Sequence, residues 1–466
     1  MRTAILSRGA GLLRPWGCPK KGRGKSAPLR IQAGRTDRGS VLIIVIWICL
    51  GLVALTLSFA NSMTSEFRAA DNSTAEVSAR LAVAGGTRYA GYLLGQFATN
   101  GAVPRRENYK SEDLPVGDAS FWFIGRDLDQ RPTNDPVFGL VDEASKLNLN
   151  TATRAMLEAL PGMTPELVDT IISWRTRNQA GGGDTTYGRL DPPRLNKGGP
   201  FESVDELRLV YGATLEILFG EDTNRNGVLD ENENDGDKSA PRDNSDGLIQ
   251  PGILEYVTVY SRQPNTRANG SRRINISTTQ VRQQFLQQRF GPQRAAPIAA
   301  RIGPGEIRSV AEFMMASGLN SEDFALIRGD ITVSNGSTVQ GLVNINTASE
   351  TVLACIPGIG ADNASAMVAY RVQHPDVLNS LFWIKEILTR EAIRRAGPYI
   401  TDQSYQFSAD VAAVGRSGRG YYREKTIFDM TKGTPRIVYH QDLSAYGWAL
   451  GARVRQSLRG ARENRS

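Results

Sequence analysis

The sequence predicts an α+β fold in which a long N-terminal helix packs on an antiparallel sheet, with a large helical insertion between the strands. The first observation is a proline-free stretch, residues 40–103, that is apolar in its first part and amphipathic in its second. The second is a set of aromatic and β-branched segments on both sides of the insertion. The third is a helical pattern that occurs more than once inside it. A chain of 466 residues is also too long for one core and indicates two or three domains.

The uncharged run over residues 41–60 is dominated by Val, Ile and Leu. As a helix it would span about 30 Å, the thickness of a bilayer's hydrocarbon core. We therefore expect residues 40–60 to form a transmembrane helix. Residues 1–39 contain ten Lys/Arg and one Asp, whereas the remaining residues carry a net charge of about −2. The positive charge thus predicts a cytoplasmic N-terminus and an outward-facing body, and it does not indicate a nucleic-acid-binding body.

The junction between Gly39 and Ser40 has the layout of a prepilin leader, in which a basic segment ending in Gly precedes an apolar helix. A secretory signal instead places its cleavage site after the apolar region, which is then lost. Cleavage after Gly39 would keep the helix in the mature protein. The alternative is an ordinary single-pass anchor with a basic cytoplasmic flank. Residues 1–39 are rich in Gly, Pro and basic side chains, and we expect them to be disordered.

The helix is expected to continue beyond the membrane as an amphipathic segment, softened at Gly85-Gly86. We call the whole element the spine helix. Residues 61–144 would hold its second half and the first strands, at 119–124 and 137–141. Further strands are predicted at residues 254–260, 273–276, 331–333, 406–411, 426–430, 436–439 and 448–454. The C-terminal strands, in residues 401–458, would join the sheet on the spine helix, and residues 459–466 would be a loose tail.

An internal duplication lies in the insertion, residues 145–400. Residues 147–163 return as residues 343–359, with seven of the seventeen positions identical at a constant offset of 196. A third, worn copy begins at residues 274–278. Each copy predicts a helix-hairpin-helix (SAM-like) unit, followed by a helix near residue 204, 310 or 384. The hairpin turns contain Pro161, Gly162, Pro357, Gly358 and Gly360.

The turn residues stop each first helix, because Pro lacks a donor and Gly accepts a positive φ. We expect Thr347 and Glu350 to form a capping box, and Asp362 and Thr164 to cap the second helices of their units. Such hairpins often bind DNA phosphates through a Gly-x-Gly turn and nearby cations. Here Asp362 and Glu166 follow the turns instead, so the pattern favours a packing or protein-contact role over nucleic-acid binding.

A calcium loop is predicted between the first two units, from Asp222 to Glu233. Oxygen ligands occur at positions 1, 3, 5, 9 and 12, Gly227 at position 6 permits a sharp bend, and position 7 offers a backbone carbonyl. The ligands would be Asp222, Asn224, Asn226, Val228, Asp230 and Glu233. Asp235 and Asp237 would shape a second site or only add negative charge. The alternative is a solvated acidic loop; Ca²⁺ here would be structural, holding together carboxylates that otherwise repel one another.

An enzyme is the weakest interpretation, because no nucleophile, base and orienting carboxylate are grouped in the sequence. Ser417 lies in a Gly/Arg-rich turn, and His374 and His440 have no evident partners. The cysteines, Cys18, Cys49 and Cys355, lie far apart and imply no disulfide framework.

Taken together, the prepilin-like junction, the Lys146–Ala152 segment and the Asp222–Asp237 loop resemble the general secretion pathway protein K family, a minor pseudopilin of the type II secretion system. The resemblance implies a pilin-like head with a helical insertion stabilised by Ca²⁺, cleavage by prepilin peptidase after Gly39, and N-methylation of Ser40. Most pseudopilins carry Glu at the fifth mature position, whereas family K lacks it, and here that residue is Ile44. The long leader, Ser at the first mature position and the number of hairpin units depart from the family pattern.

The resemblance implies a non-enzymatic subunit of the inner membrane with a periplasmic body, which caps the tip and helps start the pseudopilus. Its expected partners are the minor pseudopilins of types I and J, the inner-membrane assembly platform and prepilin peptidase. The insertion would meet secreted substrates or the outer-membrane secretin. Two alternatives stay open from the sequence: a minor pilin of a type IV pilus, and a membrane-anchored helix-hairpin-helix DNA receptor.

Overall fold

The computed structural model describes residues 40–126, 136–176, 185–415 and 418–463. The predicted disordered leader, with Gly39, and Ser417 lie outside the described residues. The chain divides into two units, residues 1–67 and 68–466, and the spine helix α1 (Ser40–Phe97) contributes to both. In the first unit, α1 contains an apolar segment long enough to cross a membrane, and none of it is buried. This matches the expected transmembrane segment.

The second half of α1 packs on the sheet, as the amphipathic pattern predicts. Small and aliphatic side chains, such as Ala79, Ala82 and Val83, form the buried stripe. The expected softening at Gly85-Gly86 is wrong, because α1 runs through both residues without interruption. A Cβ atom at Gly86 would lie 2.7 Å from Cγ1 of Val411 and 2.9 Å from Cδ2 of Phe121. Glycine here allows close approach of the helix to the sheet.

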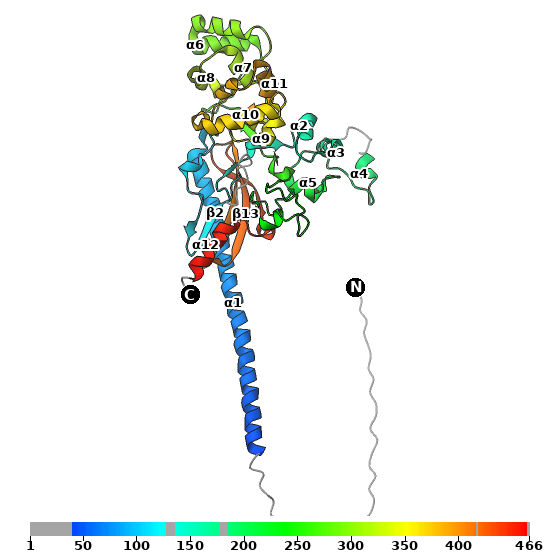
Figure 1. Cartoon of the computed structure of the whole chain (residues 1–466). Helices are drawn as coiled ribbons and strands as arrows, with labels where there is room; N and C mark the ends of the chain where they lie inside the picture. The colour runs from blue at the N-terminus through cyan, green and yellow to red at the C-terminus, as the bar shows by residue number, and fades with distance from the viewer. Residues whose placement is uncertain (1–39, 127–135, 177–184, 416–417, 464–466) are drawn as a thin grey trace, which may run out of the picture. The chain divides into compact units, whose positions relative to one another are not determined.

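The sheet joins strands from the two ends of the body (Figure 1). Its order is β1-β2-β12-β13-β14, and β3 also pairs with β12; all these pairs are antiparallel. Phe123 on β2 pairs with Val411 on β12, and Asp142 on β3 pairs with Phe407 on β12. The chain therefore leaves the sheet after β3 and returns to it at β12. Residues between them are therefore an insertion into one sheet. The strands are β1 (Leu114–Val116), β2 (Ala119–Phe123), β3 (Val141–Asp142), β12 (Gln406–Val414), β13 (Tyr421–Asp429) and β14 (Arg436–Asp442).

The C-terminal segment differs from its prediction. The predicted strand at residues 448–454 is wrong, because α12 (Gly451–Glu463) begins inside it. The predicted loose tail at residues 459–466 is helical as far as Glu463, and residues 464–466 lie outside the described residues. Val454 and Leu458, four residues apart in α12, pack with Leu450 just before the helix and with Trp122, on the face of the sheet opposite α1. A spacing of four brings side chains to one side of a helix, whereas a strand would need a spacing of two.

Each repeat in the insertion begins with a short strand and ends with a parallel partner strand. The pairs are Leu147 with Val257, Ile274 with Ile331, and Val343 with Ile400. The third copy predicted at residues 274–278 therefore closes in the same way as the other two. The strands are β4 (Leu147–Asn148), β5 (Val257–Thr258), β7 (Ile274–Asn275), β8 (Ile331–Thr332), β10 (Val343–Asn344) and β11 (Ile400–Thr401), with β6 (Arg262–Pro264) pairing β9 (Thr338–Gln340).

The helices of the units share one continuous apolar core. The first unit contains α2 (Arg154–Glu158), α3 (Pro165–Arg175), α4 (Thr185–Gly188), η4 (Val204–Leu209) and α5 (Leu215–Phe219). The second contains α6 (Thr279–Ile302), α7 (Val310–Ser317) and α8 (Ser321–Arg328), and the third α9 (Glu350–Ala354), α10 (Gly360–Gln373), η8 (Phe382–Glu386) and α11 (Arg390–Ala396). Short 3₁₀ helices elsewhere are η1 (Thr99–Gly101), η2 (Arg106–Asn108), η3 (Glu143–Ser145), η5 (Glu231–Glu233), η6 (Ile253–Glu255), η7 (Pro375–Val377), η9 (Gly397–Tyr399) and η11 (Ser444–Tyr446).

Of the predicted helix caps, only one is confirmed. Thr164 caps α3 by accepting from the backbone N–H of Leu167. Ser349, rather than Thr347, caps α9, because the Thr347 hydroxyl is turned toward Asp142 and donates to its carboxylate at 2.6 Å. Asp362 lies in the first turn of α10, which begins at Gly360 without a side-chain cap. A cap depends on where the helix starts, and α9 starts at Glu350, so its cap lies two residues after the predicted one.

Candidate functional site

The predicted calcium loop follows α5 and folds as a tight turn. Gly227 has a φ of +71°, as expected of a glycine at the sharp bend, and Arg225 also has a positive φ of +56°. The loop closes at η5, where Asp230 and Glu233 form a capping box. The local sequence thus folds the loop back on itself and brings its two ends together.

The structure gathers the side chains that the sequence predicts as ligands. The Asp222 carboxylate accepts from the backbone N–H groups of Asn226 and Gly227, both at 2.9 Å. The amides of Asn224 and Asn226 donate to Oδ2 of Asp230 at 2.6 and 3.1 Å. Glu233 accepts from the backbone N–H groups of Thr223 and Asp230. Val228 is buried, and its N–H donates to Oδ1 of Asn226 at 2.7 Å.

The electrostatics of this loop fit a cation. Burial, together with the neighbouring Asp222 and Asp230 carboxylates, raises the pKa of Glu233 to about 8. Burial also raises the pKa of Asp222. The shift of Glu233 means that its ionised carboxylate is destabilised by burial and by the charges of Asp222 and Asp230 when no positive charge lies between them. A divalent cation would remove that repulsion.

The donor set fits Ca²⁺ only if uncharged oxygens complete it. Among the described residues, no group of three Asp, Glu, His or Cys side chains is close enough to hold a metal by itself. An EF-hand loop supplies amide and backbone oxygens as well, here from Asn224, Asn226 and Val228. Asp222, Asp230 and Glu233 would add the charged ligands. Bound Ca²⁺ would link the two ends of the loop.

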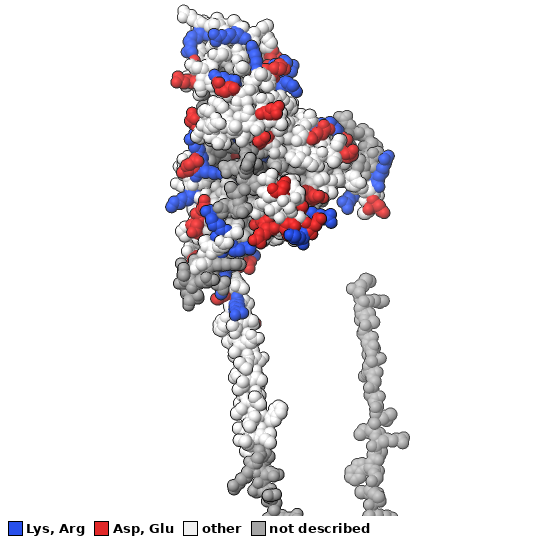
Figure 2. Space-filling view, viewed as in Figure 1, with Lys and Arg blue, Asp and Glu red and all other residues white. Residues whose placement is uncertain are grey.

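Asp235 and Asp237 lie in the turn after the loop and do not join these ligands. Asp235 accepts from the Ser239 hydroxyl at 2.7 Å, and the exposed Asp237 pairs with Arg242 at 3.5 Å. Figure 2 shows acidic side chains gathered on the surface near α5, where this segment lies. The additional acids therefore add negative charge near the loop, and the structure groups them separately from it.

Buried arginines attach the predicted calcium loop to the sheet. Arg423 on β13 is completely buried and donates to the backbone carbonyls of Asn224 and Arg225, both at 2.6 Å. Arg126, three residues after β2, also donates to the Arg225 carbonyl. Sequence reasoning missed both arginines. The sequence feature that could have revealed them is Asp410, because an acidic residue inside the apolar β12 segment needs a buried cationic partner.

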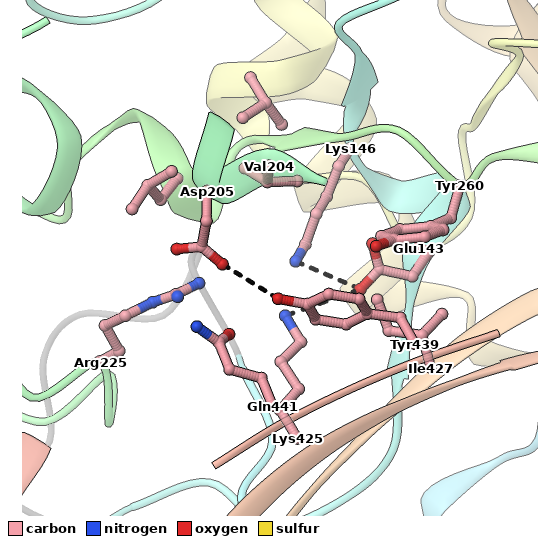
Figure 3. A pocket seen from close by; sticks show the side chains of 12 residues that line it. Glu143, Lys146, Val204, Asp205, Arg225, Tyr260, Lys425, Ile427, Tyr439 and Gln441 are labelled. Atoms are coloured by element: carbon pink, nitrogen blue, oxygen red, sulfur yellow. Dashed lines mark hydrogen bonds and ion pairs between the residues drawn. The ribbon is translucent and has the colours of Figure 1, made fainter. Parts of the chain in front are cut away.

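A charged cavity lies beside the loop, between the insertion and strands β13 and β14 (Figure 3). It has a volume of about 20 Å³, enough for about one water molecule. Burial would raise the pKa of Glu143, but the ammonium groups of Lys146 and Lys425 hold it at about 2. Their Nζ atoms lie 3.6 and 3.9 Å from Oε1 of Glu143. Across the cavity, the Tyr439 hydroxyl and Asp205 are 3.2 Å apart.

The charged side chains around this cavity form an ion-pair network between the insertion and the sheet. Burial and the like charge of Lys146 lower the pKa of Lys425 to about 8. Arg225 reaches the same cavity from the calcium loop and donates to Glu255 at 3.3 Å. The network therefore connects the calcium loop, the insertion and the sheet.

The predicted hairpin turns adopt the expected backbone. Gly162, Gly358 and Gly360 have φ values of +69°, +93° and +70°, following Pro161 in the first unit and Pro357 in the third. A Cβ atom at Gly358 would lie 2.8 Å from the carbonyl oxygen of Ala392, so this turn packs against α11. Around Gly162 and Gly360, by contrast, a Cβ atom would meet nothing within 4 Å. The hairpin turn of the third unit thus serves as a packing surface at Gly358.

The processing residues can be placed only in part. Gly39 lies outside the described residues, and Ser40 is the first residue of α1. Of the two histidines, His374 stacks on Tyr370 and His440 lies on β14. No common site joins the two histidines in the described part of the chain.

Comparison with known families identifies the segment that enters the insertion. Residues 140–218 match the family model for the type II secretion system (T2SS), protein K. The resemblance to the protein K family is confirmed. Residues 339–379, which include the turn at Gly358, match the helix-hairpin-helix motif model. The two matched segments are parts of the first and third units.

One solved structure aligns with most of the chain at low similarity. The chain aligns with a crystal structure of the GspK-GspI-GspJ complex from the type 2 secretion system of enterotoxigenic Escherichia coli. That alignment covers 83% of this chain and 98% of the other chain, at 9% identity and a TM-score of 0.36, which is too low to carry an argument. A search of curated protein sequences gave no match. The resemblance to the protein K family rests on the family model over residues 140–218.

Proposed function

We propose that this chain is the minor pseudopilin that caps the tip of a type II secretion pseudopilus, helps start its assembly, and so supports protein export across the outer membrane. The observation that carries the proposal is the place of the protein K segment. It begins an insertion within a sheet whose strands β2 and β12 are direct neighbours, packed on the spine helix. An insertion of this size fits a terminal subunit, because a subunit inside a filament must leave room for neighbours on both sides.

The spine helix would supply both anchoring and assembly. Its first half exposes large apolar side chains from Val41 to Phe59, which suits packing with lipid and with the helices of other subunits. The basic leader would keep the N-terminus in the cytoplasm, with the body in the periplasm. Prepilin peptidase would then cleave after Gly39, and Ser40 would be N-methylated. These steps are supported by the order of leader, apolar helix and protein K segment in one chain.

The proposed partners are the minor pseudopilins of types I and J and the inner-membrane assembly platform. Secreted substrates or the outer-membrane secretin would contact the insertion. The family is a component of secretion machinery, so the chain would act by binding and positioning rather than by catalysis. We also propose that the loop from Asp222 to Glu233 holds structural Ca²⁺, as its grouped oxygen ligands and the raised pKa of Glu233 suggest.

The test is affinity purification of the tagged full-length chain from its native membranes, combined with a secretion assay on a deletion strain. We expect type I and J pseudopilins to co-purify, and we expect secretion to be lost on deletion and restored by the wild-type gene. A matched control is the same chain with Gly39→Asp, which would remain an unprocessed precursor and lose the partners. Recovery of type IV pilins in place of type I and J pseudopilins, with secretion intact, would favour the type IV pilus alternative.

The helix-hairpin-helix match favours one further test, because related hairpins bind DNA. The Gly358 turn packs against α11, and Asp362 follows it where a phosphate-binding cation would be needed. We therefore expect no salt-dependent duplex binding by the full-length chain at low ionic strength. Tight binding that weakens steeply with added salt would instead support the DNA-receptor alternative.

A further inference from the structure

We propose that Arg423 couples the calcium loop to the sheet, so that cation binding in the loop and attachment of the insertion to the sheet stabilise each other. The inference rests on the proposed calcium role of the loop. Arg423 is a positioning residue in this scheme: it touches the backbone of the loop and none of the predicted ligand side chains. It deepens the proposed function by connecting a metal site to the architecture of the head.

The contacts of Arg423 lie at the centre of the loop. Its Nη1 donates to the Asn224 carbonyl and its Nη2 to the Arg225 carbonyl, both at 2.6 Å. These carbonyls belong to loop positions 3 and 4, and the ligands predicted at positions 3 and 5 lie beside them. Arg225 has a φ of +56°, which residues other than glycine seldom adopt. The bonds from Arg423 therefore support a strained part of the turn.

Asp410 fixes the guanidinium that makes these bonds. Arg423 donates to Oδ1 and Oδ2 of Asp410 at 2.8 and 2.6 Å, and both side chains are buried. A bidentate pair of this kind holds the planar guanidinium in one orientation. Because Asp410 belongs to β12 and Arg423 to β13, the loop carbonyls are held relative to the two central strands. The Asp410 carboxylate also pairs with the charge of Arg423, while the hydrogen bonds from Arg423 position the loop backbone.

Arg126, which follows β2, also holds Arg225 of the loop in place. Arg126 donates to the Arg225 carbonyl and, through Nε, to Glu255 at 3.0 Å. The Arg225 side chain also donates to Glu255, at 3.3 Å. Arg225 is thus held through its backbone and its side chain. A loop held in this way loses less conformational freedom when a cation binds, which favours binding.

The coupling must act in both directions. If Arg423 increases the affinity of the loop for Ca²⁺, Ca²⁺ must strengthen the contact of the loop with Arg423 by the same factor. Calcium bound in the insertion would then stabilise the junction with β12 and β13. Loss of calcium would loosen that junction as well as the loop.

The test measures the Ca²⁺ affinity of the full-length protein in detergent by calorimetric titration after chelation. We expect Arg423→Gln to weaken binding roughly 10- to 100-fold, as loss of outer contacts to metal ligands does elsewhere. Arg423→Lys, which keeps a donor, should recover part of this loss. The matched control is Arg262→Gln. Arg262 also joins the insertion to β13, through Asp429 at 2.5 Å, without contacting the loop, and its loss should change the affinity by less than about twofold.

Hydrogen exchange of the wild-type protein gives a second measurement that needs no variant. Calcium should slow amide exchange in residues 222–233 and also in β13 around Arg423. Protection confined to the loop, or equal Ca²⁺ affinity in folded Arg423→Gln and wild type, would overturn the coupling while leaving the calcium role in place. A wild-type protein that binds no Ca²⁺ would overturn both. If Arg423→Gln fails to fold, the exchange experiment alone decides.

Discussion

Arg175 and Arg371 lie 196 positions apart and make the same contacts in their own repeats. Arg371 donates to the carbonyls of Ile345 and Ala348 at 2.9 and 2.8 Å, and Arg175 donates to those of Leu149 and Ala152. Each arginine returns from the second helix of its hairpin to the turn that precedes the first helix. The duplication therefore preserves a three-dimensional contact as well as a sequence motif.

Replacing Arg371 should destabilise the third unit. Arg371→Met keeps most of the apolar stem and leaves two carbonyls without their charged donor, which should cost about 2 kcal/mol in free energy of unfolding. Urea denaturation of the full-length protein would measure it. Arg390→Met, at the exposed start of α11, is the control and should change stability by less than about 0.5 kcal/mol. Equal stability of the two variants would contradict the role of Arg371.

Two glycines of α1 should respond differently to replacement by alanine. Gly86→Ala would place a Cβ atom 2.7 Å from Val411 and should cost about 1–3 kcal/mol through overpacking. At Gly95 a Cβ atom would meet only Pro435, at 4.0 Å, so Gly95→Ala should be neutral or stabilising by up to about 1 kcal/mol. Thermal unfolding of both variants would measure the difference. A harmless Gly86→Ala would mean that the helix does not need close approach at this residue.

Acid should weaken the ion-pair network at Glu143. Its pKa is about 2 in the folded protein against an ordinary value of 4.5, so it stabilises the fold above pH 4.5. That contribution, on the order of 3 kcal/mol, is lost as the pH falls from 4.5 toward 2. The difference in unfolding free energy between wild type and Glu143→Gln should therefore shrink over this range. Glu158→Gln, on an exposed pair with Arg154, should keep the acid sensitivity of the wild type.

Removal of calcium should destabilise the protein if the loop binds it. At a free Ca²⁺ concentration about 100 times the dissociation constant, binding contributes about 2.7 kcal/mol, which a chelator would remove. Glu233→Gln should abolish most of the calcium-dependent rise in melting temperature. Asp237→Asn should retain it, because Asp237 pairs with Arg242 outside the loop. Identical behaviour of the two variants would contradict the proposed ligand set.

Processing at Gly39 can be tested by mass spectrometry of the protein from its native membrane. The wild type should begin at N-methylated Ser40, and Gly39→Asp should retain the full leader. Gly34→Asp, within the leader, is the control and should still be cleaved. A mature-length chain from Gly39→Asp would argue against the prepilin interpretation.

The sequence determined the features that depend on neighbouring residues. The spine helix, the proline-glycine hairpin turns and the sharp bend at Gly227 are local patterns, and the structure contains each close to where it is predicted. The duplication was also visible, since its offset is constant. The third, less similar copy at residues 274–278 was also found in the sequence, but only the pairing of β7 with β8 shows how this unit is closed.

Tertiary structure decided which distant residues meet. The pairing of Phe123 with Val411 and the bonds from Arg423 to the loop connect segments separated by long stretches of chain. Single-sequence patterns carry no signal for such contacts, because packing and charge pairing select them only after the elements have formed. The same physics turned Thr347 away from its expected cap toward Asp142, where a buried carboxylate needs donors more than a helix end does.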